Sequence, residues 1–286
     1  MKLSIITINY NNAEGLRKTL ASVAVQTYSN IEHVIVDAAS TDGSVEIIKE
    51  YAGISKHTVF WSSKRDKGIY DGMNDGIKKA TGDYIQILNS GDILAAPNVT
   101  ERMVKQLLAL NSSLLAENRV SIFYGNMLKS YDGKKVIRDN CGGQDAPESF
   151  LYFYKGTLNH DCAYIHRDLF DKYGLYNEEM KICADWEWYV KAIVLGGEKT
   201  VYTNIDVTIF DMNGVSESGG KNRDLIKQER RGYLEKILPK SVLHDYDKYA
   251  FPMEQYNRLK KYHLWGLVYF MERVLFKLEK WRILKK

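Results

Sequence analysis

The chain has 286 residues, of which 45% are hydrophobic and 27% are charged, a composition typical of a folded protein rather than a disordered one. This length is sufficient for one large α/β domain with an appendage. No apolar stretch approaches the roughly 18 residues that a membrane-spanning helix needs.

The formal net charge of +4 is unevenly distributed along the chain. Residues 257–286 contain nine Lys or Arg and two Glu, a net charge of +7, which leaves −3 for the rest of the chain. A nucleic-acid-binding domain would spread its cations over the folded part. The pattern therefore predicts a basic tail on a near-neutral enzyme or binding domain.

The N-terminus and the cysteines both favour a cytoplasmic protein. The first apolar run, residues 3–8, is short and interrupted by hydroxyl side chains, so it does not resemble the core of a signal peptide. Cys141, Cys162 and Cys183 are odd in number and widely spaced, which fits neither a disulfide framework nor a zinc knuckle. We expect all three to be reduced and structural.

Strands and helices alternate over the first 98 residues. β-Rich runs at 4–8, 31–36, 59–61 and 83–88 predict strands, and apolar residues at helical spacing predict a helix after each of the first three. This alternation is typical of a parallel α/β sheet with right-handed crossovers. Ligands bind beyond the carboxyl ends of such strands, so the polar residues there should converge. They are Asn9, Tyr10, Asp37, Asn89 and Asp92.

The second half of the chain is less regular. It predicts a helix over 99–110, a strand over 121–124, a hairpin turned at Asp132-Gly133, a helix over 185–195, an extended run over 201–210 and a mobile Gly-rich loop over 214–220. Pro239 would mark the start of the tail. The predicted domains are 1–240, with a nucleotide-binding half (1–98) and an acceptor-binding half (99–240), and a helical tail over 241–286.

Two strand-end carboxylates each have a functional and a structural interpretation. A divalent ion beside two phosphates needs hard oxygen ligands, usually one or two carboxylates with water and phosphate oxygens. Asp92 is the best candidate for such a ligand, and a cap on the helix after Pro97 is the alternative. Asp37 is placed either to accept a hydrogen bond from a base or ribose, or to brace the turn before Ser40.

Two further segments carry candidate residues. Residues 66–76 combine glycines and acids, which suits close approach of the backbone to a ligand, and the alternative is a long loop capped at Asp71. Asp185 and Glu187 lie among aromatic residues, where desolvation would raise a carboxyl pKa towards that of a general base. Acids that complement a helix dipole are the alternative. Upstream lies His160-Asp161, and a lone His is more often structural than catalytic.

Taken together, these segments resemble the family-2 glycosyltransferases, an inverting group with the nucleotide-sugar-binding GT-A fold. The resemblance covers roughly residues 1–240 and leaves the second half most loosely matched. It rests on Ser4-Ile5-Ile6-Thr7 with Tyr10-Asn11, Asp37 with Ser40-Thr41-Asp42-Gly43, Gly68-Ile69-Tyr70-Asp71 with Met73-Asn74, Gly82-Asp83-Tyr84 with Leu88-Asn89-Ser90-Gly91-Asp92, Asn159-His160, and Asp185-Trp186.

The resemblance implies transfer of a sugar, with inversion, from a nucleoside-diphosphate sugar to a hydroxyl of a glycan or lipid-linked acceptor in surface polysaccharide synthesis. A UDP-sugar is the first expectation for the donor. Asp185 would be the catalytic base, and Asp92 would help to hold Mn²⁺ or Mg²⁺ against the diphosphate. The implied nucleotide-sugar site comprises Thr7, Tyr10, Asp37, Asp66, Tyr70, Asn74 and Asn89. The implied acceptor or supporting residues are His160, Asp161 and Glu187.

Two positions depart from the family pattern. Ala38 stands where the family has a second Asp after the second strand. The metal motif reads Asn89-Ser90-Gly91-Asp92 instead of carboxylate-x-carboxylate, so Asp92 is its only acid. These changes would weaken metal binding or select a nucleotide other than UDP. They also keep open a second hypothesis, a non-catalytic relative that binds a nucleotide sugar or carbohydrate. A dinucleotide oxidoreductase is disfavoured, because no Gly-x-Gly-x-x-Gly follows the first strand.

The tail combines apolar and basic residues at helical spacing. The apolar stripe consists of Leu264, Leu267, Val268, Met271, Val274, Leu275 and Leu278, with most cations elsewhere. Such a helix suits the interface of an anionic leaflet, here the inner face of the plasma membrane. Packing on the domain or on a second subunit of a homodimer is the alternative. We expect no nucleic acid partner, because the stripe suits burial better than base stacking.

Overall fold

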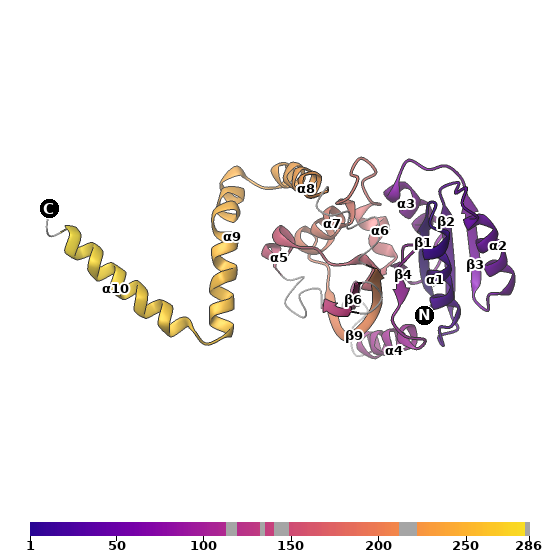
Figure 1. Cartoon of the computed structure of the whole chain (residues 1–286), viewed down its shortest axis with the longest axis horizontal. Coiled ribbons are helices and arrows are strands. Elements are labelled where there is room, and N and C mark those ends of the chain that lie inside the picture. Colours follow the sequence, from indigo (N-terminus) through magenta and orange to yellow (C-terminus); the bar gives the residue numbers. More distant parts are fainter. Residues whose placement is uncertain (113–118, 132–134, 140–148, 212–221, 284–286) are drawn as a thin grey trace. The chain divides into compact units, whose positions relative to one another are not determined.

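The computed structural model describes residues 1–112, 119–131, 135–139, 149–211 and 222–283 (Figure 1). Contacts within the chain define two compact units, Met1–Tyr233 and Leu234–Lys286. The predicted turn at Asp132-Gly133, the Gly-rich loop over 214–220 and Cys141 lie outside the described residues. The described Cys162 and Cys183 are buried free thiols, as expected.

The first unit is built on a single sheet, which has nine strands among the described residues. Their order is β3-β2-β1-β4-β8-β6-β9-β5, and β7 pairs with β6. The strands are β1 (Leu3–Asn9), β2 (Ile31–Asp37), β3 (Thr58–Ser63), β4 (Tyr84–Ile87), β5 (Ile93–Leu94), β6 (Ile122–Tyr131), β7 (Lys135–Asp139), β8 (Ala163–His166) and β9 (Thr200–Asp211). The sequence prediction of a parallel first half is confirmed, because β3, β2, β1 and β4 all pair in parallel.

The second half of the sheet is mixed. Strand β8 runs antiparallel to both β4 and β6, whereas β6 and β9 pair in parallel. The predicted hairpin is present as the antiparallel pair β6 and β7. The short strands β5 and β8 were not predicted, because two to four residues carry too little periodicity to be recognised.

Helices and short helical turns connect the strands. They are α1 (Ala13–Ala24), α2 (Ser44–Ile54), α3 (Ile69–Lys79), α4 (Val99–Ser112), α5 (Phe150–Lys155), η3 (His160–Cys162), α6 (Asp168–Tyr173), α7 (Ala184–Tyr189), η4 (Val190–Leu195), α8 (Arg223–Ile237), α9 (Lys240–Lys261) and α10 (Trp265–Ile283). The helix predicted over 185–195 is thus α7 followed directly by the π-helical turn η4.

Helices cover both faces of the parallel half. Helices α1 and α2 pack on one face, where Leu16, Ile35 and Ile48 share a buried cluster. Helix α3 packs on the other face, so closely that a Cβ atom at Gly76 would lie 2.4 Å from Cγ2 of Ile6. Adjacent side chains of a strand point to opposite faces, so β1 serves both layers. This arrangement leaves the carboxyl ends of the strands free to form a site.

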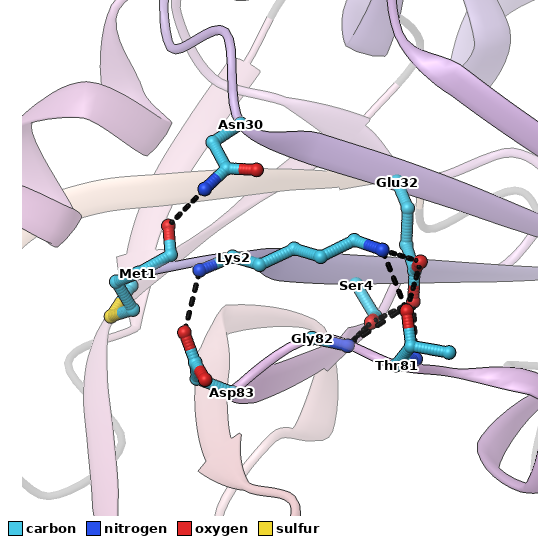
Figure 2. A network of polar contacts seen from close by, with 8 residues as sticks. All are labelled: Met1, Lys2, Ser4, Asn30, Glu32, Thr81, Gly82 and Asp83. Carbon is cyan, nitrogen blue, oxygen red and sulfur yellow. Dashed lines mark hydrogen bonds and ion pairs between the residues drawn. The ribbon is translucent and has the colours of Figure 1, made fainter.

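A polar network centred on the buried Glu32 ties together the opposite, amino-terminal edge of the sheet (Figure 2). The carboxylate of Glu32 accepts hydrogen bonds from the hydroxyls of Ser4 and Thr81 and pairs with Nζ of Lys2. Burial alone would raise the pKa of Glu32, but these donors outweigh it and lower the pKa to about 2. The network therefore joins the starts of β1, β2 and β4 far from the candidate residues.

The second unit consists of the end of α8 and the helices α9 and α10. The predicted tail helix is present as α10, and many of its apolar side chains are more than half exposed: Leu267, Tyr269, Phe270, Met271, Leu275, Phe276 and Leu278. Phe270 and Phe276 lie outside the predicted stripe and widen the apolar surface. Over the described residues, every helix is too short or too polar to cross a bilayer.

Candidate functional site

A cleft of about 1090 Å³ opens at the carboxyl ends of β1, β2 and β4. The strand-end residues converge there, as the sheet topology predicts. Of the predicted site residues, Tyr10, Asp66, Asn89 and Asp92 line the cleft. The lining also includes two cations, Lys18 and Arg65, and the aromatic Phe210 of β9.

Two loops form one wall of the cleft, and hydrogen bonds lock them together. The backbone N–H of Asn11 donates to Oγ of Ser40 (2.8 Å), and the N–H of Thr41 donates to Oδ1 of Asn11 (2.8 Å). Asn11 and Ala39 both have positive φ angles, of 47° and 58°. Such backbone strain in non-glycine residues persists only where the surroundings enforce it, so this wall is preorganised.

Asp37 lies beneath this wall and is fully buried. Its Oδ1 atom accepts from Nδ2 of Asn9 and Oγ of Ser40, and its Oδ2 atom accepts from N of Ser40 and Oγ of Ser63. These donors outweigh the effect of burial and lower the pKa of Asp37. Because both oxygens already have two donors, this geometry favours the turn-bracing interpretation over contact with a base or ribose.

Thr7 and Asn74 also lie below the surface of the cleft. The hydroxyl of Thr7 donates to the carbonyl of Leu88 (2.8 Å), which joins β1 to the end of β4. The amide of Asn74 donates to O of Tyr176 (2.9 Å) and accepts from its N–H (3.0 Å). Asn74 therefore fixes α3 to the segment that leads towards α7, and neither residue lines the cleft.

Asp66 lines the cleft and lies close to two glycines. Its Oδ1 atom accepts the N–H of Gly68 (3.1 Å), and a Cβ atom at Gly72 would lie 3.2 Å from its Oδ2 atom. Burial, with the nearby charges of Asp71 and Asp37, raises the pKa of Asp66 despite the bond from Gly68. The adjacent Arg65 was not predicted, although its place in the basic pair before Asp66 was a usable signal.

Lys18 was also not predicted. It lies on α1 and pairs with Glu14 one turn earlier (3.0 Å), so in the sequence it resembles any exposed helical lysine. Only the fold turns this face of α1 towards the cleft.

Asn89 and Asp92 belong to the metal motif, in which Asp92 is the only acid. Asp92 lines the cleft and is 7% exposed. The amide oxygen of Asn89 is buried and has no partner among the described residues. Over those residues no cluster of three or more His, Cys, Asp or Glu could hold an ion by itself. A nucleotide-bound Mg²⁺ takes one or two carboxylates and leaves other positions to phosphate and water, so Asp92 with the orphan oxygen of Asn89 fits this requirement.

Asp185 is the centre of a hydrogen-bonded cluster that adjoins the cleft. Its Oδ1 atom accepts from the hydroxyl of Tyr70 (3.0 Å), and its Oδ2 atom lies 3.2 Å from Nδ1 of His160. Nε2 of His160 lies 3.2 Å from Nδ2 of Asn89, which lines the cleft. The side chains of Asp185 and His160 are 14% and 21% exposed, so solvent has restricted access.

The pKa of Asp185 shifts in the direction opposite to the one expected from the sequence. Burial alone would raise the pKa of Asp185, as the aromatic surroundings suggested, but the hydrogen bond and charge of His160 outweigh it and lower that pKa. Burial disfavours the charged form of His160, but the bond and charge of Asp185 raise its pKa. The expected upward shift at Asp185 is therefore wrong, because an opposite charge lies against it.

Asp161 and Glu187 support the cluster from outside. The buried Asp161 accepts a hydrogen bond from the hydroxyl of Thr208 (2.8 Å), which braces η3 against β9, and burial raises its pKa. Glu187 accepts from Nδ2 of Asn177 (3.1 Å) and steadies the segment before α7. Both belong to the scaffold that holds His160 and Asp185.

Solved structures with the same architecture are GT-A glycosyltransferases. Staphylococcus aureus TarS residues 1–349 in complex with UDP-GlcNAc has a TM-score of 0.60 at 22% identity and matches 77% of this chain and 61% of that one. The mannosyltransferase PcManGT from Pyrobaculum calidifontis, in complex with GDP-Man and Mn²⁺, has a TM-score of 0.61 at 19% identity and matches 87% and 69%. The chain thus spans about three fifths of the TarS fragment, and these likenesses show the fold.

Sequence relatives identify the family. Residues 4–174 match the family described as glycosyl transferase family 2. An uncharacterized glycosyltransferase of Mycobacterium tuberculosis is 28% identical over 240 residues, which cover 83% of this chain and 85% of the relative. A PGL/p-HBAD biosynthesis glycosyltransferase of Mycobacterium bovis is 26% identical over 227 residues, with 79% and 81% covered. The chain belongs to glycosyl transferase family 2 and is a glycosyltransferase enzyme.

Proposed function

We propose that the enzyme moves a sugar, with inversion, from a nucleoside-diphosphate sugar to a hydroxyl group of a glycan or lipid-linked acceptor. The observation that carries this proposal is the position of Asp185, ionised and held by Tyr70 and His160 beside the cleft. A carboxylate so placed can take the proton of an acceptor hydroxyl as that oxygen attacks the anomeric carbon. Attack from the face opposite the leaving diphosphate inverts the anomeric centre in one displacement.

The donor would occupy the cleft beyond β1, β2 and β4. Tyr10 is 67% exposed and offers a ring for stacking on the base, and Asp66 offers a carboxylate to the base or ribose. Lys18 and Arg65 supply positive charge for the diphosphate. Because TarS binds UDP-GlcNAc and PcManGT binds GDP-Man, a UDP-sugar is the first candidate and a GDP-sugar the second.

A divalent ion completes the proposed donor site. Asp92 and the amide oxygen of Asn89 would hold Mn²⁺ or Mg²⁺ together with phosphate oxygens. When bound, such an ion offsets the negative charge that develops on the departing nucleoside diphosphate. The complex of PcManGT with Mn²⁺ supports this choice of metal.

The acceptor and the location of the enzyme form the last part of the proposal. Relatives named for PGL/p-HBAD biosynthesis support a role in building cell-surface glycans or glycolipids. The exposed apolar side chains and the basic charge of residues 257–286 support peripheral contact with the inner face of the plasma membrane. A homodimer formed through the same surface is the alternative.

The donor class can be tested by thermal shift with UDP, GDP, dTDP and CMP, each with and without Mn²⁺. We expect one nucleoside diphosphate to stabilise the protein only with metal, and Asp92→Ala to abolish the effect. Glu50→Ala is the control, because it removes an exposed acid of α2 that does not line the cleft. Stabilisation without metal would refute the proposed ion.

Catalysis can be tested with Asp185→Asn. We expect turnover to fall about 10²- to 10⁴-fold, the usual contribution of a general base, with nucleotide binding retained. Undiminished turnover would refute the assignment of the base. A wild-type protein that binds a nucleotide sugar but neither transfers nor hydrolyses it would instead be a non-catalytic relative. The replacement of an acid by Asn89 in the metal motif motivates this second hypothesis.

A further inference from the structure

The segment that leads into Asp185 is held by a residue from a distant helix. Three consecutive backbone N–H groups precede α7, those of Lys181, Ile182 and Cys183. All three donate to the carboxylate of Glu229 on α8, at 2.7, 3.1 and 3.0 Å. A carboxylate that accepts several backbone N–H bonds acts as a clamp, since such charge-assisted bonds are short and strong.

A second set of contacts joins the same two helices. The guanidinium of Arg230 lies 5.0 Å from the ring centroid of Trp186, and the ring of Tyr233 packs edge-on against that indole at 5.9 Å. The indole N–H of Trp186 donates to the carbonyl of Phe153. Trp186 follows Asp185 directly, so α8 restrains the chain on both sides of the proposed base.

The clamp also continues to the base through Tyr70. The single hydroxyl proton of Tyr70 is shared between the carbonyl of Ile182 (2.5 Å), whose own N–H is held by Glu229, and Oδ1 of Asp185 (3.0 Å). The position of residue 182 therefore determines where this hydroxyl meets the carboxylate. Glu229 is absent from the lining of the cleft and so has no direct route to the donor.

We propose that Glu229 is a positioning residue of the transfer reaction, which holds the 181–183 backbone so that Asp185 meets the acceptor hydroxyl. The inference rests on the proposed role of Asp185 as base. Loss of the clamp would let the 181–183 backbone relax and displace Asp185. A displacement of about 1 Å at a reacting group can cost about 100-fold in rate, even when the change lies away from the chemistry.

The test compares Glu229→Gln, which keeps the size and one acceptor oxygen, with Glu229→Ala. We expect both variants to lower kcat by about 10- to 100-fold, with the larger loss in Glu229→Ala. KM for the nucleotide-sugar donor should change by less than about twofold. Gln228→Ala, an exposed neighbour on α8, is the control and should retain wild-type kcat. A purely structural role would instead lower the melting temperature and the fraction of active enzyme, without a fall in kcat per active molecule at nearly constant KM.

A double-mutant cycle shows whether Glu229 acts through the base. In an Asp185→Asn background, Glu229→Gln should have no further effect on kcat, because the group that it positions is already lost. Hydrogen exchange gives a readout independent of turnover, since the amides of residues 181–183 should exchange faster in Glu229→Gln.

The outcomes separate the two proposals. If the wild type is active and Glu229→Gln has the same kcat, the positioning role of Glu229 is overturned while the proposed function stands. The same holds if the losses in kcat from Glu229→Gln and Asp185→Asn multiply in the double variant. If the wild type transfers no sugar from any nucleotide donor, the proposed function fails and the inference falls with it.

Discussion

The hydroxyl of Tyr70 donates a hydrogen bond to Oδ1 of Asp185, 115 positions later in the chain, at 3.0 Å. This bond joins α3, which starts beside the cleft, to α7, which carries the proposed base. The bond is one of several contacts between the first 98 residues and the later part of the first unit, together with those of Asn74 with Tyr176 and of Asn89 with His160.

Tyr70→Phe should weaken catalysis by a specific route. Asp185 would lose a donor that stabilises its ionised form, and a hydrogen bond to a charged group contributes roughly 1.5–3 kcal/mol. The pKa of the base would rise, so the acidic limb of the kcat profile should move to higher pH by about one unit or more. Tyr176→Phe is the control, because its buried hydroxyl has no partner among the described residues. An unmoved acidic limb would show that Tyr70 does not tune the base.

Asp37→Asn separates the two interpretations of Asp37. If the carboxylate braces the turn, an amide placed against several donors should lower the free energy of unfolding by about 1–3 kcal/mol, even without ligand. Urea denaturation of the apo protein measures this, and the exposed Asp224→Asn serves as control. Unchanged stability with a large loss of nucleotide affinity would restore the direct-contact interpretation.

Glu32 should make stability depend on pH in the acid range. Its pKa falls from 4.5 in the unfolded chain to about 2 in the folded one, so its contribution is present above about pH 4.5 and is lost as the pH falls towards 2. Glu32→Gln should cost about 1.5–3 kcal/mol at pH 7 and much less near pH 2, measured by urea denaturation at both values. The exposed Glu50→Gln on α2 should show neither effect. An equal cost at both pH values would mean that charge is not what the site requires.

The tail makes a prediction about lipid binding. The double variant Phe270→Ser and Phe276→Ser removes two side chains that are 64% and 66% exposed. Because burying a Phe contributes roughly 1.5–3 kcal/mol, flotation with phosphatidylglycerol vesicles should fall at least tenfold. Ile54→Ser, which removes an 80% exposed apolar residue from α2, is the control. Unchanged flotation, or loss of a dimer in light scattering instead, would favour the protein-packing alternative.

The sequence determined the features that depend on local periodicity and on the order of segments. The alternation of four strands with three helices and the parallel pairing of the first half follow from local patterns. The convergence of Tyr10, Asn89 and Asp92 also follows, because a right-handed parallel sheet places successive strand ends at one edge. The tail helix likewise follows from the spacing of its apolar residues.

The tertiary structure decided which polar atoms meet. The sequence suggested that Asp37 and Asp66 both contact the nucleotide sugar. In the structure, however, four hydrogen bonds from within the protein occupy the carboxylate of Asp37, whereas Asp66 lines the cleft. The downward pKa shift of Asp185 and the clamp of Glu229 depend on partners 25 and 46–48 positions away. Hydrogen bonds between segments so far apart form only when the whole domain packs, so no local pattern in the sequence could reveal them.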